Sequence, residues 1–376
     1  MANVTVVGAP SGPITLPFTN AEQAAIAQQL ASAINAGVAS GALTPEQAIG
    51  IGAPTLASGQ RGELVIQKGG IEQLAPGYVA VVAAASDITL LGDGQQNQSV
   101  LAGTGGLTYI TNGGSGTVVA SGGGNRIVTS GNSWDVSTGD GNDTLQAGSG
   151  AATLAAGGGQ NDIQLGSGTA LVDTSGRDQI QGGSGSATVN VQSGAHAFYT
   201  GGTGTLLFID TGAGSTVVGG SGAETIFGAN GAYSGGTDGN NLIYGSGTLT
   251  GGGGGDTLSA TGQRNTFLQA AGGNETLSAA LSTGADTLAA GPGNDTLFGG
   301  SGKDVFQFSQ TTGGGSTLVQ DFTATDSIHL VGYGTGEAGN AVANAVVTSA
   351  GTTVQLSDKT TITFTGVTDP TKLHFS

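Results

Sequence analysis

A ladder of apolar residues at intervals of about eight to ten positions constrains the fold of this chain more than any other feature. Between residues 86 and 306 most repeats read Gly-x-polar-x-apolar, and the apolar position persists, as at Leu145, Ile163, Ile226 and Leu297. If each short strand contributes one inward apolar residue, equivalent residues of neighbouring turns can stack into a narrow core. Glycines allow sharp turns with positive φ. The pattern predicts an all-β protein built as a parallel β-solenoid.

The position two residues before the apolar one changes its chemistry along the chain. The repeat places this position at Arg126, Asp143, Ala152, Asn161, Ala170, Asp178, Ala187, His196, Leu206, Thr216, Glu224, Asn241, Thr248, Asp256, Asn265, Glu275, Asp286, Asp295 and Asp304. The same alignment places Val128, Phe198, Val218 and Phe267 among the inward apolar residues. A flexible Gly-rich linker requires no such phased apolar residue. The polar slot is acidic in only part of the region, so any chemistry that needs acids is local.

The composition excludes several classes of protein. Gly accounts for 75 of 376 residues but shows no strict period of three, and Pro accounts for only 8. These two facts exclude collagen. A hydrophobic fraction of 37% with only 9% charged residues argues against disorder. The net charge of −17 argues against nucleic acid or anionic lipid as a partner. The chain has no cysteine and therefore no disulfide framework.

Residues 1–85 differ from the repeat and predict a small N-terminal α/β cap or interaction region. Thr19 with Glu22 three residues later forms a capping-box pattern, and Ile26, Leu30 and Ile34 would share one face of a helix that Gly37 ends. A second short helix is expected at 44–47, where Pro occupies the first helical position. Strands are expected at 63–67 and 78–84. A cap would cover the first turn of the solenoid, whose backbone groups are otherwise unpaired.

Residues 307–376 contain less glycine and more alternation, which predicts a C-terminal β region with strands at 319–322, 328–331, 352–356 and 361–364. A hairpin turn is expected at 357–359. The sequence shows no N-terminal signal peptide and no apolar run of membrane-spanning length. Any export signal would therefore lie elsewhere in the chain.

Three segments carry the chemistry. Residues 291–297 read Gly-Pro-Gly-Asn-Asp-Thr-Leu, residues 299–306 read Gly-Gly-Ser-Gly-Lys-Asp-Val-Phe, and residues 140–145 read Asp-Gly-Asn-Asp-Thr-Leu. They match the calcium-binding nonapeptide G-G-x-G-x-D-x-U-x. Ca²⁺ takes six to eight oxygen ligands, which glycine-turn carbonyls and aspartates can supply. The candidate ligand residues are Asp286, Asp295, Asp304, Asp140 and Asp143, with the turn glycines Gly293, Gly300 and Gly302.

In these segments the chain resembles the RTX family of type I-secreted bacterial proteins, and its tail resembles the segment that closes RTX β-rolls. The resemblance implies Ca²⁺ as the bound ion, and export guided by the C-terminal region. It also implies that loops 18 residues apart share an ion, so Asp286 and Asp304 would face one site. Asp295 would lie on the opposite side with Leu277 and Gly313 at the equivalent positions, which makes it a half-site.

The departures from the motif limit the number of ions. Most repeats between 150 and 220 have Ala, Leu, Thr or His in the acidic slot, and the turn before Asp286 has no double glycine. We expect about one to four calcium ions of weak affinity, on the order of 10⁻⁴–10⁻³ M. The alternative is that these aspartates are turn residues that bind no metal. The sequence contains no recognisable zinc ligand set, P-loop or Ser/His/Asp arrangement. Trp134 is expected in a turn, packed against the solenoid surface.

Repeats fill most of the chain and leave no domain of enzyme size, so the sequence favours a non-enzymatic secreted or cell-surface protein. Such a protein would be a biofilm-matrix, surface-layer or adhesive component that assembles with copies of itself or contacts a polysaccharide. The alternative is a carbohydrate-binding or polysaccharide-modifying RTX accessory protein. An enzyme of that kind would need Asp173, Asp178, Glu224 and Arg177 to converge in a groove. Ice binding is disfavoured because Thr forms no regular outward array.

Overall fold

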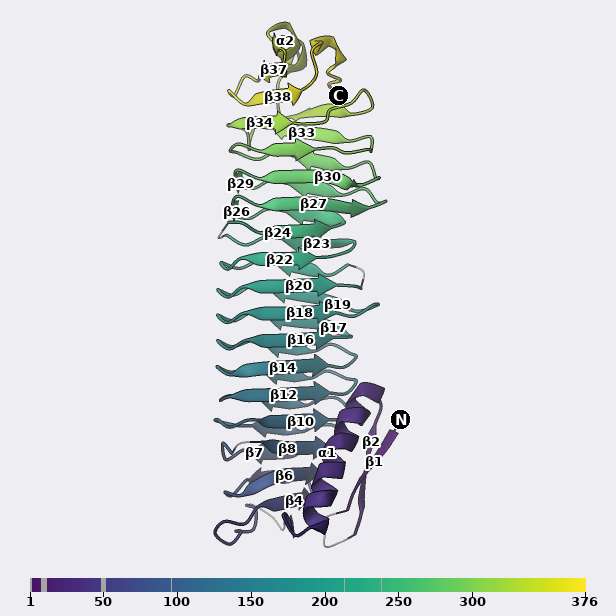
Figure 1. Cartoon of the computed structure of the whole chain (residues 1–376), viewed down its shortest axis with the longest axis vertical. Coiled ribbons are helices and arrows are strands. Elements are labelled where there is room, and N and C mark those ends of the chain that lie inside the picture. Colours follow the sequence, from purple (N-terminus) through teal and green to yellow (C-terminus); the bar gives the residue numbers. More distant parts are fainter. Residues whose placement is uncertain (1, 8–11, 49–51, 96, 213, 238) are drawn as a thin grey trace. The chain divides into compact units, whose positions relative to one another are not determined.

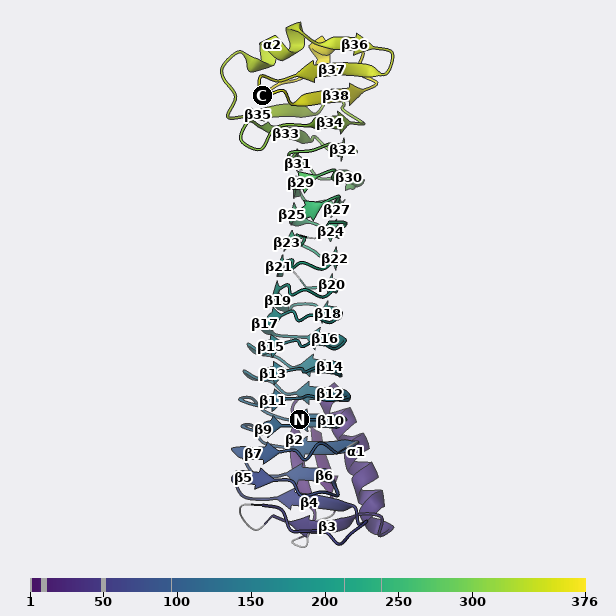
Figure 2. The same cartoon turned by 90° about the vertical axis from the view of Figure 1, so that its left-hand side faces the viewer.

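A computed structural model describes residues 2–7, 12–48, 52–95, 97–212, 214–237 and 239–376. The chain divides into two compact units, residues 1–198 and 199–376. Each unit is by itself a parallel β-solenoid, in which successive short strands alternate between two facing sheets (Figures 1 and 2). The predicted fold class is confirmed.

In unit 1 the two facing sheets are called sheet 1 and sheet 2. Sheet 1 contains β3 (Thr44–Gln47), β4 (Gly62–Ile66), β6 (Tyr78–Ala83), β8 (Gln98–Ala102), β10 (Gly116–Ala120), β12 (Ser133–Thr138), β14 (Ala151–Ala156), β16 (Ala170–Thr174) and β18 (Ala187–Val191). Sheet 2 contains β5 (Gly70–Gln73), β7 (Ile88–Leu91), β9 (Thr108–Ile110), β11 (Arg126–Val128), β13 (Thr144–Gln146), β15 (Asp162–Gln164) and β17 (Arg177–Gln181). β19 (His196–Thr200) lies at the boundary between the units. Parallel pairing begins at β3, inside the region expected to act as a cap.

The core of unit 1 consists of buried apolar columns, one from each sheet. Val100, Val118 and Val136 stack in sheet 1, and Ile127 and Leu145 stack in sheet 2. Burial of these columns is the main favourable term in stacking the turns. The ladder read from the sequence is therefore the physical core.

Several registers in the ladder differ by one residue from the expected ones. In β11 Ile127 is buried, so the slot before the strand belongs to Asn125, not Arg126. Phe198 is 48% exposed and Val218 is 44% exposed, whereas the neighbouring Tyr199 and Val217 are buried. In unit 2 the registers at 248 and at 265–267 are also shifted by one residue. The buried residues there are Leu249, Thr266 and Leu268. Two adjacent apolar residues fit either face equally well, so their period cannot choose between the faces.

The N-terminal segment packs against the outer face of sheet 1. β1 (Ala2–Val6) and β2 (Ile14–Phe18) form an antiparallel hairpin, and α1 (Ala21–Ala39) runs along the strands β4 to β10 (Figure 1). Asn20 caps α1 because its Oδ1 accepts from the amide of Glu22 at 2.8 Å. The predicted helix is confirmed, but its cap is Asn20 and it continues past Gly37.

The segment 44–47 was expected to be a second short helix, and this expectation is wrong. It is the strand β3, which pairs in parallel with β4. Pro45 lacks an N–H, which a strand tolerates at the edge of a sheet.

Trp134 was expected in a turn, and this expectation is also wrong. The residue lies in β12 and is buried in the core, with its ring edge-on to that of Tyr109 at 5.7 Å between ring centroids.

In unit 2 the two facing sheets are called sheet 3 and sheet 4. Sheet 3 contains β20 (Leu206–Asp210), β22 (Glu224–Phe227), β24 (Leu242–Gly245), β27 (Thr257–Gly262), β30 (Thr276–Ser282), β32 (Thr296–Phe298) and β34 (Ser316–Val319). Sheet 4 contains β21 (Thr216–Val218), β23 (Gly231–Ser234), β25 (Gly247–Thr250), β28 (Phe267–Gln269), β31 (Thr287–Ala289), β33 (Val305–Ser309) and β35 (Ser327–Val331). The short strands β26 (Gly253–Gly254) and β29 (Gly272–Gly273) pair with each other along one side.

The C-terminal residues close the end of unit 2. β36 (Val346–Thr348), β37 (Gly351–Gln355) and β38 (Thr361–Thr365) form an antiparallel set, and β38 pairs in parallel with β34. α2 (Glu337–Ala343) and a 3-10 turn at Pro370–Lys372 complete the tail. The amide of Ile328 in β35 donates to the carbonyl of His374 at 2.7 Å, so the last strand of sheet 4 is also covered. The strands predicted at 328–331, 352–356 and 361–364 and the hairpin turn are confirmed. The strand expected at 319–322 is instead β34, which ends at Val319 because this buried residue stacks on Leu297 of β32. Neither helix of the described chain has the length and hydropathy needed to cross a membrane.

Candidate calcium site

The acidic slots in sheet 4 form a column of hydrogen bonds on the inner side of the turns. Oδ1 of Asp286 accepts from the amide of Thr266 at 2.6 Å, and Oδ1 of Asp304 accepts from the amide of Asp286 at 2.8 Å. Oδ1 of Asp326 continues the column by accepting from the amide of Asp304 at 3.0 Å. Each aspartate precedes a strand, so its side chain joins two consecutive turns. Asp286 and Asp304, which were expected to face one calcium site, therefore lie on consecutive turns of this column.

The second carboxylate oxygen distinguishes Asp286 and Asp304 from Asp295 and Asp326, whose Oδ2 atoms have donors. Asp286 and Asp304 are only 1% exposed, and the Oδ2 atom of each is buried with no hydrogen-bond donor. Burying a carboxylate oxygen without a partner is unfavourable, and a bound cation removes that cost. These two oxygens, 18 residues apart in the chain, fit the hard oxygen ligands that Ca²⁺ prefers.

The turns beside these aspartates require glycine. A Cβ at position 302 would lie 2.1 Å from the carbonyl oxygen of Gly284, which leaves no room for a side chain. Gly300 adopts a φ of +82° in the turn before β33. Its amide donates to Oδ2 of Asp321 at 2.8 Å, while the amide of Gly299 donates to Oδ1 of Asp321 at 2.7 Å. These two amides therefore donate to Asp321, and neither donates to Oδ2 of Asp304.

The electrostatics of the column favour a cation. The pKa of Asp304 is raised to about 6, mainly by burial and in addition by the nearby carboxylates of Asp326, Asp286 and Asp321, while a hydrogen bond from the Asp286 amide lowers it. Like charges held together in a poorly solvated place disfavour ionisation. A divalent cation among these carboxylates would reverse that effect because it favours the charged form.

Asp295 has different neighbours from the expected ones. Thr276 pairs with Thr296 and Thr296 with Leu318, so the positions level with Asp295 are Glu275 and Thr317, not Leu277 and Gly313. The turn there spans 20 residues instead of 18, as the bond from the Glu275 amide to Asp295 Oδ1 at 3.1 Å shows. Oδ2 of Asp295 accepts from the amide of Gly291 at 2.9 Å, so both of its oxygens have donors.

Gly293, the third candidate glycine, lies in the turn before Asp295. Its φ is +133°, and it forms bridges with the glycines at 273 and 315 on the neighbouring turns. A Cβ there would lie 1.6 Å from the carbonyl oxygen of Gly273. Its role in this structure is close stacking of the turns.

Glu275 is a buried acid that the spacing did not identify as part of a site. Both of its carboxylate oxygens are buried without a hydrogen-bond partner. Burial raises its pKa to about 8, and Asp295 and Asp256 add to the shift. An acidic stack therefore exists in sheet 3 as well. The repeat placed Glu275 in the polar slot, but its pairing with Asp295 requires a turn of 20 residues.

Unit 1 has a similar column at Asp143. Oδ1 of Asp143 accepts from the amide of Asn125 at 2.7 Å and from its Nδ2 at 3.0 Å, and the amide of Asp143 donates to Oδ1 of Asn161 at 2.9 Å. Burial raises the pKa of Asp143, and its Oδ2 has no hydrogen-bond partner although the Thr138 hydroxyl lies beside the carboxylate and lowers the pKa.

Asp140 is exposed in the preceding turn, where its Oδ1 accepts from the amide of Gly158 at 3.2 Å. The structure therefore does not bring Asp140 into the buried column. Asp178 ends the unit 1 column with both oxygens bonded, to Asn161 and to the Thr174 hydroxyl.

Asp321 and Asp326 are further residues that the sequence reasoning did not assign to the site. Asp326 follows the same rule as the others, because it precedes the buried Ile328 by two residues. In the described ranges no three His, Cys, Asp or Glu side chains are grouped as a metal site would require. Calcium coordination would therefore need backbone carbonyls in addition to the carboxylates. Loops of stacked glycine turns supply such carbonyls.

Two of the acids that a solenoid enzyme would need lie on different sheets within unit 1. Asp173 lies on the outer face of β16 in sheet 1, whereas Asp178 is buried beside β17 in sheet 2. In unit 2 the carboxylate of Glu224 is buried, and it accepts from the amides of Gly220 at 2.9 Å and Gly236 at 2.7 Å. Asp173 and Asp178 therefore do not share one groove within unit 1.

Comparison with known proteins agrees with this geometry. The family of the RTX calcium-binding nonapeptide repeat matches residues 137–169 and 282–308, in four copies. These segments contain Asp143, Asp286, Asp295 and Asp304. No curated protein and no solved structure matches the chain. The chain therefore carries RTX calcium-binding nonapeptide repeats within a parallel β-solenoid, and Ca²⁺ is the ion that these repeats bind.

Proposed function

We propose that this protein is a non-enzymatic, extracellular structural or adhesive protein whose repeats are ordered by Ca²⁺ bound at the turns of Asp286 and Asp304. The observation that carries the proposal is the pair of buried Oδ2 atoms without donors, 18 residues apart in the column. In this arrangement Asp286 and Asp304 supply charge, and the carbonyls of the adjacent glycine turns supply the remaining oxygens. Asp143 would hold a second ion in unit 1.

Calcium-dependent thermal stability tests the proposal. Millimolar Ca²⁺ should raise the melting temperature above that in EDTA, because the ion binds only the folded turns. The variant Asp286→Asn/Asp304→Asn should lose most of that rise. Asp162→Asn, which removes one charge from an exposed position in β15, is the control. An unchanged melting curve with and without Ca²⁺ in the wild-type protein would sink the proposal.

The proposal includes self-association at a cell surface or in a matrix. It is supported by the share of the chain that repeats occupy and by exposed apolar residues on the outer face of sheet 3, where Phe227 and Tyr244 stack at 5.6 Å between ring centroids. Association through the end of unit 2 is disfavoured, because residues 361–376 cover β34 and β35 there. Light scattering and electron microscopy with Ca²⁺ should show oligomers; monomers alone at high concentration would contradict this part.

An extracellular location is supported by the RTX repeats, because proteins with these repeats are generally exported by type I secretion. Fractionation of the native host should place the protein in the medium or at the cell surface. A protein recovered only from the cytosol would overturn this part and leave the calcium chemistry intact. The alternative function, binding of a carbohydrate, has its own structural support in unit 1.

A further inference from the structure

We propose that a groove beside the N-terminal end of α1 binds an amine-bearing oligosaccharide. The groove is defined by two adjoining cavities in unit 1, of about 270 Å³ and about 410 Å³, which share Ile26, Ser137 and Ala155. The inference deepens the proposed extracellular role by naming a ligand class. It does not depend on the calcium site.

The groove exists because α1 covers only part of the outer face of sheet 1. Leu101, Val119, Ser137, Ala155 and Asp173 form one outward row across β8 to β16. Leu101 and Val119 are fully buried under the N-terminal segment, whereas Ala155 and Asp173 are partly exposed beyond the end of the helix. The helix end is thus one wall of the groove, and β12, β14 and β16 form its floor.

Gln23 fixes that wall in place. Its Nε2 donates to the carbonyl oxygens of Ala120 at 2.8 Å and Ser137 at 3.2 Å, which joins α1 to the ends of β10 and β12. The side chain is 1% exposed and lines the smaller cavity, and its Oε1 has no donor. A buried acceptor without a donor at the edge of a polar cavity is a place where a ligand hydroxyl or amine can bind.

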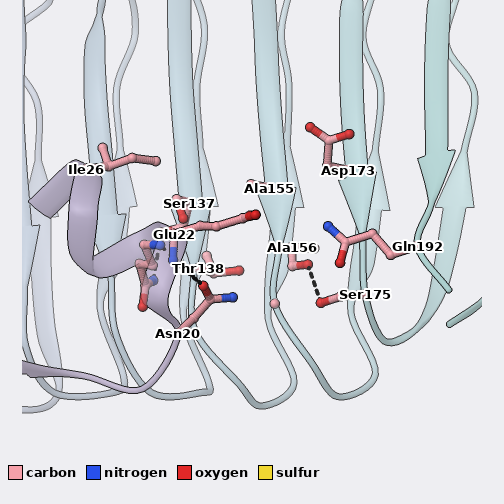
Figure 3. A pocket seen from close by; sticks show the side chains of 12 residues that line it. Asn20, Glu22, Ile26, Ser137, Thr138, Ala155, Ala156, Asp173, Ser175 and Gln192 are labelled. Carbon is pink, nitrogen blue, oxygen red and sulfur yellow. Dashed lines mark hydrogen bonds between the residues drawn. The ribbon is translucent and has the colours of Figure 1, made fainter. Parts of the chain in front are cut away.

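The rest of the lining is polar and acidic. Glu22 reaches across the cavity from α1, and Asp173 and Gln192 face it from the strand side (Figure 3). Oδ1 of Asp173 accepts from Nδ2 of Asn190 at 2.8 Å, which orients the carboxylate. Asp135 adds a third acid in the larger cavity.

The chemistry of this lining selects the ligand class. Carboxylates and side-chain amides recognise hydroxyl and ammonium groups, and Ile26 with Ala155 offers apolar contact for a sugar ring. Ile26 is 37% exposed and lines both cavities, so its side chain is available for this contact. In the described residues that line the two cavities none is basic, so an acidic glycan such as a polyuronate would be repelled.

Isothermal titration of the full-length protein with the glucosamine tetrasaccharide from chitosan tests the inference, in 0.15 M NaCl to suppress loose charge attraction. Cellotetraose, which lacks the amines, and tetragalacturonate, which is acidic, are the comparison ligands. We expect one site for the glucosamine tetrasaccharide, binding of cellotetraose at least about tenfold weaker, and no binding of tetragalacturonate. Absence of binding, equal affinity for cellotetraose, or a stoichiometry well above one overturns the inference.

Two variants locate the site. Glu22→Gln/Asp173→Asn keeps the side-chain sizes and removes two charges, and it should weaken binding at least about tenfold. Ala155→Phe should block the groove sterically. Asp162→Asn, on the opposite sheet, should bind as the wild type does. Unchanged affinity in both groove variants places the ligand elsewhere and overturns the inference.

The calcium response of the groove variant separates this inference from the proposed function. Glu22→Gln/Asp173→Asn should show the full calcium-induced rise in melting temperature, because the Asp286/Asp304 column is intact. If the variant instead binds fewer calcium ions than the wild type, the two carboxylates form a cation site and the saccharide assignment is wrong.

Discussion

A neighbouring backbone carbonyl leaves no room for a side chain at position 302. The Cβ of an alanine there would lie 2.1 Å from the oxygen of Gly284, so one of the two turns must move. We predict that Gly302→Ala lowers the free energy of unfolding by roughly 1–3 kcal/mol, the usual cost of overpacking. Gly334→Ala is the matched control, because nothing lies within 4 Å of a Cβ at that position. Urea denaturation measures both, and equal stability of the two variants would contradict the stacked turns.

Residues of this kind show what could be predicted from sequence and where the prediction stops. The pair Asp286 and Asp304 was predicted because the segments around them resemble RTX repeats, in which loops 18 residues apart share an ion. Glu275 and Asp326 were not predicted as members of a column, because their turns contain 20 and 22 residues. Residues inserted in a turn do not change which residues face inward. They change the number of residues between equivalent positions, so a fixed spacing no longer identifies those positions.

At the scale of elements, α1 is held by small residues. Ala24, Ala27 and Ala31 are buried against sheet 1, which allows the helix to approach the strands closely, whereas Ile26 points toward the groove. The sequence predicted the helix but assigned Ile26 to its buried face, because hydropathy alone ranks isoleucine above alanine. What decides the face is the flat sheet beneath it, which the local pattern does not contain.

A charge on the buried face should release α1. We predict that Ala27→Glu exposes the apolar surface of β8 and β10, because an unpaired buried carboxylate is strongly unfavourable. The variant should bind a hydrophobic dye and lose amide protection throughout α1. Ala25→Glu, two residues away on the exposed side, introduces the same charge and should resemble the wild type. Similar dye binding and exchange in both variants would mean that the helix is not held by this face.

For the molecule as a whole, the buried acids link stability, protons and calcium. The chain carries a net charge of −17, and its turns bury carboxylates that face one another instead of bases. In the absence of metal, a proton is the available counter-charge; in its presence, Ca²⁺ takes that role. The metal-free and calcium-bound proteins should therefore differ most in how their stability depends on pH.

The sign of that dependence follows from the raised pKa values. Burial raises the pKa of Glu275 to about 8, so the folded protein keeps a proton that the unfolded chain releases near 4.5. The stability from this proton is fully present below pH 4.5 and is lost as the pH rises toward 8. The proton on Asp304 acts in the same way, because its contribution to stability is fully present below pH 3.8 and is lost as the pH rises toward about 6. In EDTA, the melting temperature should therefore fall between pH 5 and pH 8.5.

Two comparisons test the assignment of this fall to the buried acids. Glu275→Gln should flatten the upper part of the profile, above pH 6, because glutamine is neutral at every pH. Saturating Ca²⁺ should reduce the lower part, between pH 5 and 6, because the ion replaces the proton at Asp304. Asp162→Asn should keep the wild-type profile, since this exposed aspartate is not part of a column. A metal-free melting temperature that rises with pH would show that these carboxylates are ionised and solvated in the folded protein.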